Sequence, residues 1–551
     1  MKHHTISIII LILLTVTLAY PQSWQWSNAA GNTGPDRGIT VCIDQTGNSY
    51  VGGQIYSPYS YFKTDTLVIN GLNDMFIAKY DGTGHELWVK QLGGPNNSLI
   101  NIKYETINDL VYDSTGNCLY ITGQFVEQCD FGITTLNSFI DDSQLFFGKF
   151  DLNGNCIWVK EIGGNGDDGI VDITNDNLGN IYLYASISNN GHIDTIATSN
   201  GGYIAKFDST GNCIFAKKIY NNNTVFPFEP VAFSSLRFYN NELYAAGYNN
   251  HDTLMLDTIA ITNPNYYGSI LAKFDTNGNI EWAKQNGGPT GYFNVMDIDL
   301  TGNIYLAGSF FGNYATVAND TLHASGNTEM YFVKFDYNGN KLWLKQSNSS
   351  QAVQPYNINT DADGNSYITG YFNGNADFDT FNITASSTSD IFLARYNTLG
   401  DCLGVRHPGE GKGMGVISNS SGECYLTGGF KNTINFGLTT MTSYGAEDVF
   451  IAKIDAITGI GGGEERKANN GLVIYANPNA GKCNITIPDD FVNETNLVLS
   501  IYDNSGKLIQ QKTLEMNDGN IKLNLEQEAK GVYNVVLSNK KKSYNGKIVF
   551  E

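Results

Sequence analysis

The chain has 551 residues and a formal net charge of −21, and it is rich in Gly (60), Tyr (33) and Phe (29). Its length suffices for about three or four domains, and its composition excludes a disordered tail protein and a long coiled coil. The acidic balance argues against a nucleic acid partner, because surfaces that bind nucleic acid are basic. Aromatic side chains, Gly and Asn-rich turns over hundreds of residues predict an all-β chain.

Residues 1–20 have the layout of a Sec signal peptide. A short polar, positively charged start precedes an apolar run from Ile6 to Leu14, and Thr17 and Ala19 form the small pair before a cleavage site. The alternative, a membrane anchor, needs about 20 apolar residues. No later apolar run is long enough to cross a bilayer, so we expect an exported mature protein without a transmembrane segment.

Two motifs recur along residues 21–459. The first resembles DQTGNSYVGG, which begins at Asp44, and the second resembles MFIAKYDGTGHELWVK, which begins at Met75. The tyrosines of the first motif are separated by 58 to 70 residues, and such a period indicates a repeat architecture. We number the repeats unit 1 to unit 7 by these tyrosines: Tyr50, Tyr120, Tyr182, Tyr244, Tyr305, Tyr367 and Tyr425.

Each unit is predicted to form four strands. Both motifs contain a DxxGN-type turn, in which Asp accepts backbone N–H bonds and Gly adopts positive φ. Two such hairpins make a four-stranded antiparallel sheet, and seven of these sheets predict a seven-bladed β-propeller.

The ends of the repeat array predict closure of the ring. The outermost strand carries an aromatic residue in five units, such as Trp88 and Trp158, with Leu403 at this place in unit 6. Unit 7 stops at Gly459 without this strand, while an orphan copy lies at Ser23–Trp26. We therefore expect residues 23–28 to complete the seventh sheet, leaving no exposed edge.

The pattern GNxYxxG followed by DxFIAKYDxxGxxLWxKQxGG resembles the seven-bladed propeller repeats of secreted bacterial proteins, over about residues 22–459. The resemblance implies a fold and no single activity.

A polar linker at 460–470 separates the repeats from a different β pattern at 471–551, which is charge-balanced, so the excess of acidic residues lies upstream. Four ordered motifs, around Asn477, Gly506, Gly531 and Lys547, resemble the C-terminal sorting domain of the type IX secretion system of Bacteroidetes; Ala476 stands where that family has proline. The resemblance implies a small immunoglobulin-like β-sandwich recognised by the type IX machinery, which releases its cargo or attaches it to the cell surface. The residues matching these motifs are Asn477, Pro478, Gly481, Gly506, Lys507, Gly531, Tyr533 and Lys547.

Motifs that would indicate chemistry are missing, so we assign no catalytic, cofactor-binding or metal-binding residue. Segments such as DADGN at Asp361 look like calcium loops but lack the later bidentate acid, which favours turn chemistry. The histidines show no zinc spacing, and no P-loop or GxSxG is present. The eight cysteines are expected to be mostly buried free thiols.

A cationic residue recurs in the second motif of every unit, for example Lys79 and Lys149. Strand alternation places it between neighbouring sheets, where it can bond to a carbonyl or a carboxylate of the next unit. A role in every unit favours packing over recognition.

Ligand binding is expected where the units differ, in the connections between the second and third strands, which share one rim of the ring. These connections are rich in aromatic residues and amides, which suit stacking and hydrogen bonding to glycans or a protein partner; the alternative is that the aromatics pack beneath the loops. The candidate rim residues are Tyr56, Tyr59, Tyr61, Tyr266, Tyr267, Phe311 and Tyr314.

The sequence thus predicts an exported or surface-attached propeller that acts as a binding or adhesion module for glycan or protein. The alternatives are a propeller-based polysaccharide lyase or glycosidase with acids in the axial funnel, and a structural envelope protein.

Overall fold

The computed structural model describes residues 24–455 and 472–550, except 57, 96–103, 139–142, 165, 167, 177, 220–230, 250–252, 263–267 and 286–289 in the first range and 476–480, 487–490, 492–496, 504–506, 515–519, 526 and 540–542 in the second. The predicted signal peptide and linker lie outside these residues. The chain divides into two compact parts: residues 1–464, which contain the seven repeat units, and residues 465–551, which we call the C-terminal unit. The elements of the described residues are β-strands, as the composition predicts.

Every repeat forms a four-stranded antiparallel sheet, in which each strand pairs with the next strand of the unit. The sheets of units 1 to 3 contain β2 (Arg37–Ile43), β3 (Ser49–Tyr56), β6 (Asn73–Tyr80) and β7 (Glu86–Leu92); β8 (Thr106–Asp113), β9 (Cys118–Val126), β12 (Ser143–Phe150) and β13 (Cys156–Gly164); and β14 (Gly169–Asn175), β15 (Ile181–Ile187), β18 (Gly201–Phe207) and β19 (Cys213–Lys218). Those of units 4 and 5 contain β20 (Val231–Tyr239), β21 (Glu242–Asn249), β24 (Gly268–Asp275) and β25 (Ile280–Gln285); and β26 (Thr290–Ile298), β27 (Ile304–Phe311), β30 (Thr328–Phe335) and β31 (Lys341–Gln346).

Units 6 and 7 continue this order, and the N-terminal strand supplies the fourth strand of the last sheet. Unit 6 contains β33 (Ala352–Thr360), β34 (Ser366–Asn373), β37 (Asp390–Tyr396) and β38 (Cys402–Arg406); unit 7 contains β39 (Gly411–Ser418), β40 (Cys424–Phe430) and β43 (Asp448–Ile454), which pairs with β1 (Trp24–Ala30). Trp26 lies opposite Lys453 just as Trp88 lies opposite Lys79. In unit 6 this place belongs to Gly404, opposite Arg395, so the assignment of Leu403 was wrong by one residue.

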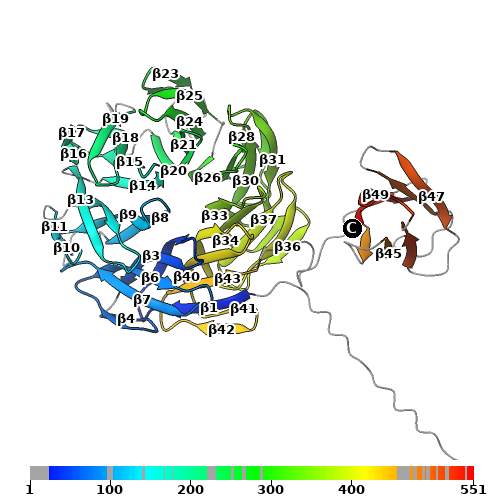
Figure 1. The fold of residues 1–551 in the computed structure, drawn as a ribbon, viewed down its shortest axis with the longest axis horizontal. Helices are drawn as coiled ribbons and strands as arrows, with labels where there is room; N and C mark the ends of the chain where they lie inside the picture. Colours follow the sequence, from blue (N-terminus) through cyan, green and yellow to red (C-terminus); the bar gives the residue numbers. More distant parts are fainter. Residues whose placement is uncertain are drawn as a thin grey trace, which may run out of the picture. The chain divides into compact units, whose positions relative to one another are not determined.

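The sheets pack around a ring in sequence order (Figure 1). The first strand of each unit contacts that of the next, from β2 through β8, β14, β20, β26 and β33 to β39, and β39 contacts β2 again. The first strands are therefore innermost, which is the arrangement of a β-propeller. Buried apolar clusters form between neighbouring sheets; one of them joins Tyr182 and Ile204 of unit 3 to Phe233 and Leu236 of unit 4.

The DxxGN segments form the predicted turns. Asp44 Oδ1 accepts the N–H groups of Thr46 (2.9 Å) and Asn48 (3.0 Å), and Gly47 has a φ of 82°. In unit 2 Asn117, rather than the preceding glycine, adopts positive φ (47°). Because these N–H groups satisfy the carboxylates, the segments act as turns.

The recurrent cations lie between the sheets, as predicted. Lys79 Nζ donates to the carbonyl of Leu152 in unit 2 (3.3 Å) and lies 4.9 Å from the ring centre of Tyr50. Lys149 Nζ contacts the carbonyl of Ser209 in unit 3 at 3.0 Å. Lys79 and Lys149 therefore each join one unit to the next, as the packing interpretation predicts, whereas Lys273 and Lys453 pair with carboxylates of their own units, Glu242 and Glu423.

Residues 472–550 contain two sheets that share one apolar core. The core includes Ile485 and Leu523 from the first sheet and Ile501 and Val535 from the second. The strands are β44 (Val473–Tyr475), β45 (Lys482–Thr486) and β48 (Asn520–Asn524) in one sheet, and β46 (Leu497–Tyr502), β47 (Leu508–Leu514), β49 (Gly531–Ser538) and β50 (Ser543–Phe550) in the other.

Candidate functional site

The connections between second and third strands contain short hairpins, which lie at the outer margin of the ring in Figure 1. Several of them bond to the end of the outermost strand of the preceding unit: Tyr61 exchanges two 3.1 Å backbone bonds with Gly31, and Ile193 pairs with Ile162. The predicted rim is therefore made of anchored hairpins rather than open loops. The hairpins are β4–β5 (Tyr59–Tyr61, Thr66–Val68), β10–β11 (Gln128–Asp130, Thr135–Asn137), β16–β17 (Gly191–Ile193, Ile196–Thr198), β22–β23 (Thr253–Leu256, Ile259–Thr262), β28–β29 (Tyr314–Val317, Asp320–His323), β35–β36 (Asn375–Phe378, Phe381–Thr384), which also pairs with β32 (Asn348–Ser349), and β41–β42 (Thr433–Phe436, Thr439–Thr442).

Two of the predicted rim tyrosines meet a third tyrosine at the junction of units 7 and 1. Alternation along β4 turns Tyr59 and Tyr61 outward and buries Ser60. The ring centres of Tyr59 and Tyr61 are 5.1 Å apart, and that of Tyr444 is 6.3 Å from Tyr61. Their exposed fractions are 38%, 43% and 69%, respectively. We call these three residues the tyrosine cluster. Tyr444 lies in one of the variable connections, but it was not among the rim residues predicted from the sequence.

The other candidate rim residues do not join this cluster. Phe311 and Tyr314 are exposed (38% and 56%) in unit 5. Tyr56 is half-buried against Tyr104 of unit 2, with 5.8 Å between ring centres, and burial raises the pKa of its hydroxyl. Tyr266 and Tyr267 lie outside the described residues.

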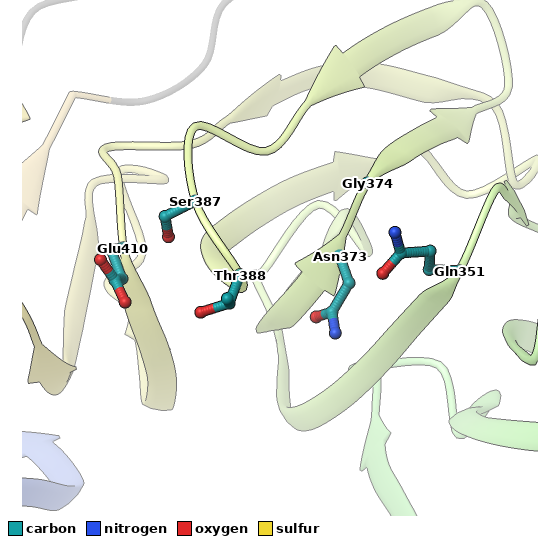
Figure 2. A pocket seen from close by; sticks show the side chains of 6 residues that line it. All are labelled: Gln351, Asn373, Gly374, Ser387, Thr388 and Glu410. Atoms are coloured by element: carbon teal, nitrogen blue, oxygen red, sulfur yellow. The ribbon is translucent and has the colours of Figure 1, made fainter.

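A cleft of about 710 Å³ opens where units 6 and 7 meet, and amide, hydroxyl and carboxyl groups line it: Gln351, Asn373, Gly374, Ser387, Thr388 and Glu410. Figure 2 shows Glu410, Ser387 and Thr388 on one side and Asn373 and Gln351 on the other. Its volume is within the range of small-molecule sites. Sequence reasoning missed it, because its walls come from the ends of several strands and connections.

Acidic side chains also meet on the innermost strands. Arg237 of β20 contacts Asp172 of β14 (Nη1 to Oδ2, 2.9 Å) and Asp297 of β26 (Nε to Oδ1, 3.0 Å). Burial raises the pKa of Asp172 well above its usual range, although Arg237 opposes the shift. The Leu236 N–H also donates to Asp172 (2.7 Å). The carboxylates are thus held by a cation and by backbone groups, and they tie units 3, 4 and 5 together.

The described sorting-motif residues lie on turns and strands of the C-terminal unit. Gly481 has a φ of 94° before β45, and Lys507 is exposed and exchanges two 3.0 Å bonds with Asp503. Gly531 begins β49, in which Tyr533 is buried and donates to the carbonyl of Ala529. Lys547 lies in β50, whereas Asn477, Pro478 and Gly506 lie outside the described residues.

Within the part of the chain that the structure describes, no helix combines the length and apolarity needed to span a membrane. The same residues contain no group of three or more His, Cys, Asp or Glu side chains that could hold a metal ion. The eight cysteines are free thiols, and all except the half-buried Cys213 are buried.

Residues 473–551 match the family model described as secretion system C-terminal sorting domain. This match supports export by type IX secretion to the cell surface or beyond, with the secretion machinery as a partner. It covers the C-terminal unit and leaves the repeats unassigned.

The chain is similar to an uncharacterized WD repeat-containing protein of Acanthamoeba polyphaga mimivirus, at 23% identity over 68% of this chain; the match spans 27% of that relative's length. Among solved structures, the Dos1 propeller matches at 10% identity and a TM-score of 0.39, covering 81% of this chain and 96% of that one. A puromycin hydrolase complexed with PGG matches at 9% identity and a TM-score of 0.40, covering 83% and 62%.

Proposed function

We propose that the chain is an exported binding module: a seven-bladed β-propeller, closed by its N-terminal strand, that contacts a glycan or a protein through the tyrosine cluster. The immunoglobulin-like C-terminal unit, 471–551, directs it through type IX secretion after a signal peptide at 1–20 has taken it across the inner membrane. The match of residues 473–551 to a secretion sorting domain supports the export route.

The tyrosine cluster carries the binding proposal. Three exposed tyrosine rings within 6.3 Å of their neighbours form an amphipathic surface, with apolar faces for stacking and hydroxyls for hydrogen bonds. The backbone bonds between Tyr61 and Gly31 hold β4 in place, so little ordering entropy would be lost on binding. Repeated residues build the ring, whereas this cluster occurs at a single junction of the described units.

A screen of the full mature protein against a glycan and polysaccharide array tests this proposal. The Tyr61→Ala and Tyr444→Ala variants are expected to lose about 10-fold or more in affinity for a ligand found in this way. Tyr314→Ala, which removes an exposed tyrosine from another unit, is the matched control and should bind like the parent. Equal binding by all three variants would contradict the role of the cluster, and a blank array would turn the search to protein partners by surface cross-linking.

The second candidate is a polysaccharide lyase or glycosidase. The observation in its favour is the axial group of Asp172, Arg237 and Asp297, in which Asp172 has a strongly raised pKa, as a general acid requires. Under this alternative, Asp172→Asn abolishes turnover of a bound polysaccharide and leaves binding intact. If turnover persists in the variant, the acids have a structural role. A purely structural envelope protein is the third candidate, and a saturable ligand would argue against it.

The sorting proposal predicts the fate of a truncated chain. Removal of residues 471–551 should leave the protein in the periplasm, because the repeats lack the matched sorting domain. Cell fractionation and protease accessibility measure this. Normal surface display of the truncated chain would contradict the proposal.

A further inference from the structure

The innermost strands of units 7 and 1 carry cations at equivalent positions. Arg37 pairs opposite Gln54, and Lys412 pairs opposite Gly429; each partner follows the repeat tyrosine of its unit by four residues. The corresponding residues of units 2, 3, 4 and 6 are uncharged: Thr106, Gly169, Ala232 and Gln354. The two cations are therefore a local feature of units 7 and 1 and not part of the repeat. They stand out because the chain as a whole has a net charge of −21.

The two cations differ in their partners. Arg37 Nη2 is 2.6 Å from Glu447 Oε2, so its charge is balanced within the fold. Lys412 Nζ lies 5.1 Å from the ring centre of Tyr371, and among the described residues it has no carboxylate within ion-pair distance. Lys412 is thus a half-buried cation that a negatively charged group can still approach.

Strand alternation places Lys412 beside the cleft between units 6 and 7. Lys412 and Glu410 are two residues apart where β39 begins, and Tyr371 and Asn373 are two residues apart in β34, so each pair shares one side of its strand. Glu410 and Asn373 line the cleft, and Lys412 and Tyr371 are the next residues on the same sides of these chain segments. The ring of Tyr356 lies 5.6 Å from that of Tyr371 and extends the aromatic surface.

The cleft itself offers groups that bond to hydroxyls. Ser387, Thr388 and Gln351 supply donors and acceptors, and Glu410 Oε2 accepts a 2.7 Å bond from Asn432, which fixes the orientation of its carboxylate. Asn373 Oδ1 is buried and accepts no hydrogen bond from the described residues. If the Asn373 amide rotates, a hydroxyl of the ligand can donate a hydrogen bond to this oxygen.

We propose that this cleft, together with Lys412 and Tyr371, binds a saccharide whose ring carries a carboxylate, such as a hexuronate unit of an acidic polysaccharide. The carboxylate contacts the Lys412 ammonium, the sugar face lies on Tyr371, and the hydroxyls reach Asn373, Thr388 and Glu410. Because the chain upstream of residue 471 carries the net charge of −21, an unpaired cation is what admits an anionic ligand here. This inference rests on the proposal that the protein is an extracellular binder, but it concerns a site separate from the tyrosine cluster.

Calorimetric titration of the full mature protein with oligogalacturonate, and with the same oligosaccharide after methyl esterification, tests the proposal. The acidic form is expected to bind about 10-fold or more tightly than the ester, and its affinity should fall as salt rises. The Lys412→Met variant should lose this preference, and the Thr388→Val variant should bind both oligosaccharides more weakly. Lys431→Met, which removes an exposed lysine from the same unit, is the charge control and retains the preference.

The outcomes separate this inference from the binding proposal itself. Equal affinity for acid and ester, or a preference that survives Lys412→Met, overturns the assignment of this site. Binding that is lost in Tyr61→Ala and unchanged in Lys412→Met also overturns it, although the protein then remains a binder through the tyrosine cluster. A folded parent protein that binds neither oligosaccharide overturns it as well.

Discussion

At the scale of single residues, pairs of buried carboxyl groups meet at the junctions between units. A Cβ added to Gly31 would lie 2.6 Å from Asp448 Oδ1 and 3.0 Å from Asp36 Oδ2, so the glycine separates the two acids. Burial is the main cause that raises the pKa of Asp448 to about 7 and that of Asp36 to about 6. Two like charges this close also disfavour each other, so the pair holds a proton to a higher pH than an exposed carboxyl group does.

The junction of units 2 and 3 shows what replaces such a pair. A Cβ on Gly163 would meet Asp168 Oδ2 at 2.3 Å and Gln144 Oε1 at 2.8 Å, so an amide stands at the place that Asp448 takes beside Gly31. Glutamine is neutral at every pH, as a protonated carboxyl group is. This junction thus resembles the protonated form of the acid pairs.

The Asp448→Asn variant should therefore be more stable than the parent at high pH. Because the folded-state pKa of Asp448 is raised, its contribution to stability is complete below about pH 4 and is lost as the pH rises through about 7. The melting temperature of the variant should exceed that of the parent by about 2 °C or more at pH 8, with the difference vanishing near pH 4.5. Calorimetry from pH 4.5 to 8 measures this.

The reverse change provides the control. Gln144→Glu creates a second acid beside Asp168 and should lower the melting temperature at pH 8 more than at pH 4.5. Parallel pH profiles for the parent and both variants would show that the junction acids do not share a proton.

At the scale of single elements, β1 completes the sheet of unit 7 and also reaches unit 1. Trp26 lies opposite Lys453, and its Nε1 donates to the carbonyl of Gly82 in unit 1 (3.1 Å). Its ring lies 6.3 Å from that of Tyr80 and 6.1 Å from that of Tyr425. One tryptophan thus joins the last unit to the first.

Deletion of residues 21–28 should lower the melting temperature, because it exposes the edge of β43 and removes the Trp26 contacts. The deleted protein is also expected to aggregate through this unpaired edge. Scanning calorimetry and light scattering measure the two effects. A melting temperature equal to that of the parent would mean that β1 does not fasten the ring.

At the scale of the whole ring, polar side chains connect the innermost strands from one unit to the next. Thr40 Oγ1 donates to Asp109 (3.0 Å), Arg237 bridges Asp172 and Asp297, and Asn359 accepts the N–H of Ser418 (2.7 Å). Together these residues come from units 1 to 7. These residues form a polar belt around the ring, in which side chains of neighbouring units satisfy one another's hydrogen bonds.

Arg237→Ala should destabilise the ring by about 3–5 kcal/mol at pH 8, because it leaves Asp172 and Asp297 buried without their cation. Both acids already have raised pKa values. At pH 5 they take up protons in the variant, and the loss should be smaller. Urea denaturation at the two pH values measures this, and a loss that does not depend on pH would contradict the charge-based explanation.

Much of the fold could be predicted from particular residues. The spacing of Tyr50 and its equivalents, the DxxGN turns and the orphan Trp26 gave the four-stranded units and the pairing of β1 with β43. The site was predicted only in part. Tyr59 and Tyr61 were found because they lie in a variable connection, but their neighbour Tyr444 is 383 positions further along the chain than Tyr61.

The sequence by itself determined the local rules of this protein: which segments form strands, where the tight turns between them lie, and which tail carries the sorting motifs. These depend on interactions within a few residues, and the repeat presents them again and again. Only the tertiary structure decided which side chains meet at the junctions, namely the tyrosine cluster, the cleft beside Lys412, the acid pair at Gly31 and the belt through Arg237. Each of these joins residues from different units, and the distance between such residues is set by how the sheets pack.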